Sequence, residues 1–176
     1  MLSIFIAAIL GFAAFVSLGL WGRRRPDAIH RDPLVGALLA EPQESLLRLV
    51  QSVLAGMGMT SSVKALGRDG VDLLAERTGA LGPEKLYVRV ATPRSGWVDQ
   101  SEVQAAMDTA RWGYQGRAIL ICPGEFSSAA RHRAAGEALE LVDGPRLVEL
   151  ARERAPDALP ARLRRRPPLR GGRLPV

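Results

Sequence analysis

The hydrophobic pattern of this 176-residue chain separates a long apolar start from a region of short alternating elements. Residues 41–57 carry apolar side chains at helical spacing, which predicts a helix that ends at Gly56 and Gly58. Three strand-like runs follow, over residues 60–66, 71–77 and 85–91. The second and third runs are separated by glycine and proline, so they are expected to lie close together in one sheet.

The second half of the chain alternates helices and strands. Residues 118–122 are continuously apolar, as in a central strand covered on both faces, and residues 139–142 form a further short strand. The residues expected to cap the intervening helices are Asp99, Ser127 or Ser128, and Asp143. Because the later strands alternate with helices, the chain is predicted to be an α/β sandwich around a mixed sheet.

Residues 2–21 contain no charged side chain, and twenty residues are about the length of a membrane-spanning helix. Arg23, Arg24 and Arg25 follow at once. The positive-inside rule then places the N-terminus outside and the rest of the chain in the cytoplasm. A signal peptide is the alternative, but no basic residue precedes the apolar run and no cleavage pattern follows it. We therefore expect a single-pass inner-membrane protein with a transmembrane helix over residues 1–22.

The segments on either side of the expected domain, 43–155, have different compositions. Residues 23–42 are basic and contain three prolines, which predicts a linker with a short helical turn over 34–39. Residues 156–176 are rich in proline, arginine and glycine and are expected to be disordered. This tail either binds nucleic acid or anionic lipid or is simply solvated. Its candidate binding residues are Arg162, Arg164, Arg165, Arg166, Arg170 and Arg173.

The net charge of +6 is unevenly distributed along the chain. Residues 35–155 hold 14 basic and 15 acidic side chains, so the expected domain is nearly neutral. The excess of arginine lies in the flanks, and DNA affinity depends mainly on basic residues that neutralise phosphates. Cys122 is the single cysteine, which excludes an intrachain disulfide and a cysteine zinc cluster. At the end of an apolar strand, it is expected to be a buried thiol.

Several short motifs occur in the order found in one known family. Asp72 enters an apolar strand from a glycine turn, and the strand at 85–91 follows directly. The later pieces are the strand at 116–122, the Gly-Glu-Phe-Ser run at 124–127 and the Leu-Glu-Leu-Val-Asp-Gly run at 139–144. Over residues 46–152 the chain resembles the catalytic domain of Mrr-type restriction endonucleases, which have the PD-(D/E)xK nuclease fold. The resemblance implies a three-layer domain around a mixed sheet, and DNA as the partner.

The resemblance also implies a metal-dependent active site, of which this chain keeps one residue. In the family, the first strand supplies Asp and the second supplies Gln or Glu followed two residues later by Lys. Here these positions are Asp72, Arg89 and Ala91. An arginine repels Mg²⁺ and an alanine offers no amine, so no metal or cofactor is expected. We hypothesise that Arg89 pairs with Asp72 across adjacent strands; alternatively, Arg89 faces solvent and Asp72 only caps the turn.

Neither lysine of the chain is well placed to replace the missing one. Lys85 shares a strand face with Ala91 but lies six residues away, about 20 Å along an extended strand. Lys64 on the preceding strand is the remaining candidate for a relocated lysine. Glu76 and Glu102 are interpreted as the polar face of a strand and a helix-capping residue.

The sequence therefore predicts a membrane-anchored, catalytically inactive nuclease-like domain that binds nucleic acid. One alternative is a docking or scaffold subunit that binds another protein. A second is an active Mg²⁺-dependent nuclease with relocated catalytic residues. In the folded domain, an exposed apolar patch would favour the scaffold. A clustered arginine face would favour DNA, and its members would be Arg68, Arg89, Arg94, Arg111 and Arg117.

Overall fold

The computed structural model describes residues 33–79, 82–93, 95–113 and 116–164. The predicted transmembrane helix, residues 1–22, lies outside these ranges, as does the tail beyond residue 164. Within the described ranges, none of the helices combines the length and the apolar character needed to cross a bilayer.

A mixed five-stranded sheet forms the centre of the domain, in the spatial order β1-β2-β3-β5-β7. β1 pairs with β2 and β2 with β3 in the antiparallel sense, whereas β3–β5 and β5–β7 are parallel pairs. The strands are β1 Thr60–Leu66, β2 Gly70–Gly79, β3 Gly82–Ala91, β5 Ala118–Ile121 and β7 Leu139–Val142. This arrangement confirms the predicted α/β architecture with a mixed sheet.

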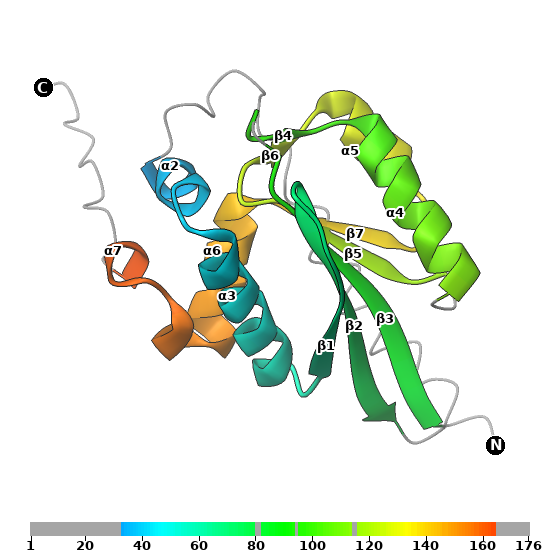
Figure 1. Cartoon of the computed structure of the whole chain (residues 1–176), viewed down its shortest axis with the longest axis horizontal. Helices are drawn as coiled ribbons and strands as arrows, with labels where there is room; N and C mark the ends of the chain where they lie inside the picture. The colour runs from blue at the N-terminus through cyan, green and yellow to red at the C-terminus, as the bar shows by residue number, and fades with distance from the viewer. Residues whose placement is uncertain (1–32, 80–81, 94, 114–115, 165–176) are drawn as a thin grey trace, which may run out of the picture.

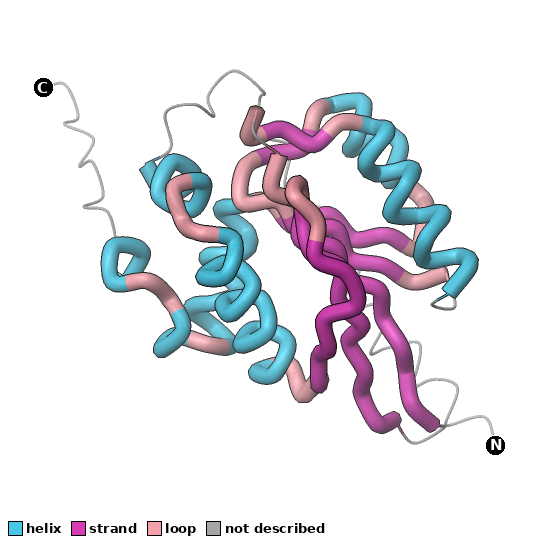
Figure 2. Tube along the Cα trace, viewed as in Figure 1, coloured by secondary structure: helices cyan, strands magenta, loops and turns pink. Residues whose placement is uncertain are grey.

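Helices cover both faces of the sheet and complete three layers (Figure 1). One face carries α3 (Gln43–Gly56) and α6 (Gly144–Arg154), and the other carries α4 (Gln100–Gly113) and α5 (Ser128–Ala134). Figure 2 shows the strands running between the two groups of helices. Because side chains alternate along a strand, β3 supplies Val88 to the core under α3 and α6, and Tyr87 to the core under α4 and α5.

The helix starts follow the capping residues expected from the sequence. Asp99 Oδ1 accepts hydrogen bonds from the backbone N–H groups two and three residues later, at 2.8 and 3.2 Å. Ser127, rather than Ser128, caps α5, and Asp143 caps α6. These bonds satisfy N–H groups that have no partner within the helix, so the caps fix where each helix begins.

Two strands of two residues each form a second small sheet that the sequence pattern did not predict. β4 (Trp97–Val98) pairs in parallel with β6 (Glu125–Phe126), and the two are far apart in the sequence. Two residues carry no measurable alternation, so only the tertiary arrangement reveals such strands.

The folded domain is larger than the predicted 43–155. α2 (Pro33–Leu39) precedes it, and the fully buried Leu38 joins the core below α3 and α6. At the other end, a 3₁₀ turn (Pro156–Ala158) and α7 (Ala161–Arg164) continue the chain, so the predicted disordered tail does not begin at 156. Leu159 and Leu163 are 2% and 0% exposed. These two side chains suffice to anchor a segment whose average composition suggests disorder.

The single thiol lies just after β5, as expected. Cys122 is buried in the core under α4 and α5. Burial raises the pKa of this thiol to about 12, so it remains a neutral, inert thiol at neutral pH.

Candidate functional site

The two family positions that carry charge face each other across the β2–β3 hairpin. The antiparallel register places Asp72 directly opposite Arg89. Arg89 donates from Nη1 to Asp72 Oδ1 at 2.7 Å. This ion pair confirms the hypothesis that the arginine turns toward Asp72 rather than toward solvent.

Two further side chains, which the sequence analysis did not assign to the site, complete the cluster. Glu102, in the first turn of α4, accepts a hydrogen bond from Arg89 Nε at 2.6 Å. Tyr87 lies two residues before Arg89 on the same strand face, and its hydroxyl donates to Asp72 Oδ1 at 2.8 Å. The interpretation of Glu102 as a helix-capping residue was therefore wrong, because its carboxylate binds Arg89 and only its backbone N–H takes part in the cap, donating to Asp99. We call these four residues, Asp72, Tyr87, Arg89 and Glu102, the arginine cluster.

The arginine cluster is only partly shielded from solvent, and its arginine remains charged. The side chains of Arg89 and Asp72 are 24% and 23% exposed. Burial by itself lowers the pKa of Arg89, but hydrogen bonds to Glu102 and Asp72 outweigh it and hold this pKa above its usual value. Burial, followed by the hydrogen bond to Asp72, raises the pKa of the Tyr87 phenol. The cluster therefore holds a permanent cation between two carboxylates and a neutral hydroxyl donor.

These residues do not fit a magnesium ion. Mg²⁺ requires several oxygen ligands in near-octahedral geometry, and its catalytic use needs open coordination positions. In the arginine cluster, the guanidinium already occupies Asp72 Oδ1 and Glu102 Oε1, and it carries a charge that repels a cation. Over the described ranges of the chain, no group of three or more His, Cys, Asp or Glu side chains could hold a metal.

The position that carries lysine in the family is occupied here by Ala91, which is buried. Ala91 is 1% exposed and packs in the core under α4 and α5 with Cys122 and Phe126. A lysine there would have to place its ammonium among apolar side chains or reach past them.

The two lysines of the chain do not fill this role either. Lys85 pairs with Glu76 at 3.7 Å. Lys64 lies at the β1–β2 irregularity, where the register passes from Val63 to Ala65, opposite Asp72. A bulge re-aims side chains, yet within the described residues the exposed Lys64 forms no ion pair with Asp72.

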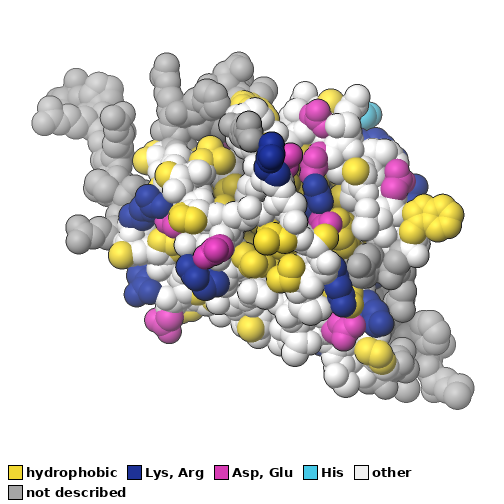
Figure 3. Space-filling model, viewed as in Figure 1, with side chains coloured by type: hydrophobic (Ala, Val, Ile, Leu, Met, Phe, Trp, Pro, Cys, Tyr) yellow, Lys and Arg dark blue, Asp and Glu magenta, His cyan; other side chains and the backbone are white. Residues whose placement is uncertain are grey.

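Two of the arginines proposed to form a DNA-binding face are paired with carboxylates of the domain. Arg111 forms an ion pair with Glu137 at 3.0 Å, and Arg89 is held in the arginine cluster. Arg68 is exposed, whereas Arg94 lies outside the described residues. Figure 3 shows basic and acidic side chains interspersed over the face in view, without a broad basic area.

The tail arginines that the structure describes are bound to the domain itself. Arg162 donates from Nε to Glu41 Oε1 at 2.7 Å, and Arg164 donates from Nε to the carbonyl of Leu159 at 2.6 Å. The other four candidates lie outside the described residues: Arg165, Arg166, Arg170 and Arg173.

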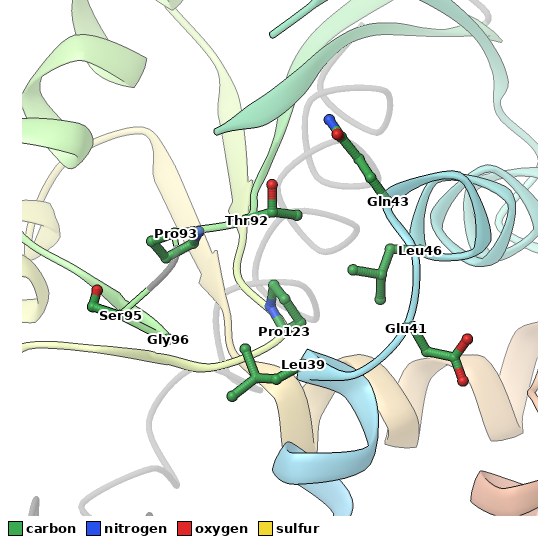
Figure 4. A pocket seen from close by; sticks show the side chains of 9 residues that line it. All are labelled: Leu39, Glu41, Gln43, Leu46, Thr92, Pro93, Ser95, Gly96 and Pro123. Atoms are coloured by element: carbon green, nitrogen blue, oxygen red, sulfur yellow. The ribbon is translucent and has the colours of Figure 1, made fainter. Parts of the chain in front are cut away.

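A hollow of about 270 Å³ opens between the α2–α3 turn and the loop after β3 (Figure 4). Its lining includes Leu39, Gln43, Thr92 and Pro123, which offer apolar surface and neutral hydrogen-bonding groups. Among the described lining residues, the ionisable one is Glu41, which Arg162 already binds. The part of the hollow that the structure describes therefore offers no second ionisable group to complete an acid–base pair.

Replacing Tyr87 by phenylalanine tests the internal support of the arginine cluster. Tyr87 is only 2% exposed. The change removes its hydroxyl and leaves Asp72 with one hydrogen-bond donor fewer. We expect the free energy of unfolding to fall by about 1–1.5 kcal/mol in urea unfolding. An unchanged midpoint would mean that the Tyr87–Asp72 hydrogen bond contributes nothing to stability.

Comparison with known proteins identifies this architecture. The DNA modification-dependent restriction endonuclease AspBHI has a similar fold, with a TM-score of 0.52 and 13% identity over 76% of this chain. The MspJI restriction endonuclease, in complex with a 27-mer oligonucleotide, gives a TM-score of 0.45 and 18% identity over 67% of the chain. The aligned regions span only 39% and 30% of those two chains, respectively. No match was found among curated protein sequences. The Mrr_cat restriction endonuclease model matches residues 38–151, and the chain therefore belongs to this family.

Proposed function

We propose that this domain is a non-cleaving member of the restriction endonuclease family that binds DNA. The observation that carries the proposal is the position of Arg89, whose guanidinium lies between Asp72 and Glu102. A cation built into the protein there compensates both carboxylates. A metal bound here would have to displace the guanidinium of Arg89 from both carboxylates and leave the charge of the arginine unpaired.

Family membership and the structural neighbours support DNA as the partner. Both neighbours are restriction endonucleases, one described as dependent on DNA modification and one in complex with an oligonucleotide. Because most described arginines are paired within the domain, we expect weak binding that relies on additional basic residues. Among the described residues, the exposed cations Lys64 on β1 and Arg68 in the following turn form no ion pair, and further arginines follow residue 164 in the sequence.

We further propose that the domain acts at the inner membrane. The support is the uncharged run at residues 2–21 followed by Arg23, Arg24 and Arg25. In this arrangement the domain is cytoplasmic, and the C-terminal arginines lie within reach of either DNA or anionic lipid.

Titration with a short DNA duplex over a range of salt concentrations tests the proposal. The full chain is compared with a chain that ends at Arg164, where the described domain ends. The shorter chain lacks Arg165, Arg166, Arg170 and Arg173. We expect the full chain to bind and the salt slope of log K to fall by about 3–4 in the shorter chain, roughly one per arginine.

The outcomes separate DNA binding from protein docking. Residual binding by the shorter chain places a DNA contact on the domain itself. Absence of binding by both chains would contradict the proposal and favour the scaffold alternative. In that alternative, the exposed apolar side chains of Trp112 (92% exposed) and Leu66 (72% exposed) are available for a protein partner to contact.

A further inference from the structure

A second cavity lies on the opposite face of the sheet from the arginine cluster. It has a volume of about 240 Å³ and is lined by α3, α6 and the strands β5 and β7. α3 supplies Val53 and Met57, and β5 supplies Ile119 and Ile121. Since Asp72, Tyr87 and Arg89 face α4 on the other side, this cavity is separate from the family site.

One charged side chain lies on the sheet side of this apolar cavity. Glu140 is the second residue of β7, and the cavity residues beside it are Ile119, Ile121 and Val142. In the described part of the chain, Glu140 forms no hydrogen bond or ion pair, and no fully buried side-chain oxygen lacks a partner. The carboxylate oxygens of Glu140, which lines the cavity, are therefore not fully buried.

Among the described residues, the other charged side chains that line the cavity all come from α6. They are Arg146, Glu153 and Arg154, while α3 and β5 contribute apolar side chains. Arg146 donates to Glu149 at 3.2 Å, which leaves Glu140 without a direct partner. Burial raises the pKa of Glu140, and the positive charge of Arg146 only partly offsets this effect. The ionised carboxylate would be stabilised by a cation placed inside the cavity.

We propose that this cavity binds a small apolar molecule that carries one ammonium group, which pairs with Glu140. The shape agrees with this class of ligand, because binding sites are concave and mostly apolar with a few polar groups that fix orientation. At roughly 30 Å³ for each non-hydrogen atom, the volume accommodates about eight such atoms. Gly56 allows α3 and α6, which line the cavity, to approach closely. A Cβ added at Gly56 would lie 2.1 Å from the Arg154 carbonyl oxygen and would collide with it.

The test compares three probes of equal length on the full chain: hexylamine, hexanol and hexanoate. Binding is followed by amide chemical shifts of the residues that line the cavity. We expect hexylamine to bind at least about tenfold more tightly than hexanol, because only the amine gains the charge pair with Glu140. Its affinity should fall as the pH is lowered through the raised pKa of Glu140, since protonation removes the charge.

Two variants localise the effect. Glu140→Gln keeps the shape of the side chain and should reduce hexylamine binding to the level of hexanol. Glu44→Gln, at an exposed position in the first turn of α3, is the matched control and should change nothing. Equal binding of hexanol and hexylamine to the unaltered chain would overturn the proposal, even if Glu140→Gln fails to fold. If hexanoate bound more tightly than hexylamine, the proposal would also be overturned, because the arginines of α6 would then recognise the ligand.

Discussion

Replacing Arg89 by methionine is expected to lower the free energy of unfolding by about 2–3 kcal/mol. The variant keeps an unbranched apolar stem but removes the charge that compensates Asp72 and Glu102. Both carboxylates would then face each other in a partly buried site without a cation. The measurement is urea unfolding of the unaltered chain and the variant at neutral pH.

A matched control is available on the same hairpin. Arg77 forms an ion pair with Glu84 at 2.6 Å, but the two side chains are 48% and 46% exposed. Arg77→Met is expected to cost less than about 1 kcal/mol, since solvent screens exposed pairs. Equal losses in the two variants would contradict the structural role assigned to Arg89.

The same variant should respond to divalent metal. With the guanidinium gone, Mg²⁺ or Mn²⁺ can occupy the space between Asp72 and Glu102, and any ligand that binds only the folded state raises its stability. We expect millimolar metal to recover part of the loss in Arg89→Met and to leave the unaltered chain unchanged. A similar stabilisation of both proteins would indicate a metal site elsewhere.

Replacing Leu163 by alanine is expected to destabilise the domain by about 2–5 kcal/mol. This leucine lies in α7 with 0% of its side chain exposed, in the core shared with α3 and α6. Its removal leaves a cavity at the junction that holds the C-terminal segment. Thermal or urea unfolding of the variant measures the loss.

An exposed leucine provides the comparison. Leu66 at the end of β1 is 72% exposed, and Leu66→Ala should change stability by less than about 0.5 kcal/mol. A chain that ends at residue 155, the boundary expected from composition, should be less stable than one that ends at Arg164. If Leu163→Ala or this truncation had no effect, α7 would not belong to the folded domain.

The sequence could predict the features that depend on local pattern. Strand-like runs between turn residues, and a continuous apolar run at β5, located all five strands of the main sheet, and polar residues ahead of the helices located the caps at Asp99 and Asp143. The Asp72–Arg89 pair was also predictable, because a short connection between β2 and β3 favours an antiparallel hairpin in which the two residues meet.

The features that depend on how distant elements pack could not be predicted. Glu102 reaches Arg89 only because α4 docks beside β3, and its position three residues after a cap suggested a different role. The signal for Tyr87 was its place on the same strand face as Arg89, but a buried aromatic side chain is more often a packing residue. Leu159 and Leu163 are buried, but they are two apolar residues in an arginine-rich segment. The average composition of that segment therefore predicted disorder.

DNA cleavage tests the central claim most directly. Supercoiled plasmid is incubated with the full chain and Mg²⁺ or Mn²⁺, beside the variant Asp72→Ala. If Arg89 has replaced the metal, neither protein cleaves the plasmid. Cleavage by the unaltered chain that is lost in Asp72→Ala would contradict the account, because it would show that Asp72 still serves a working nuclease site.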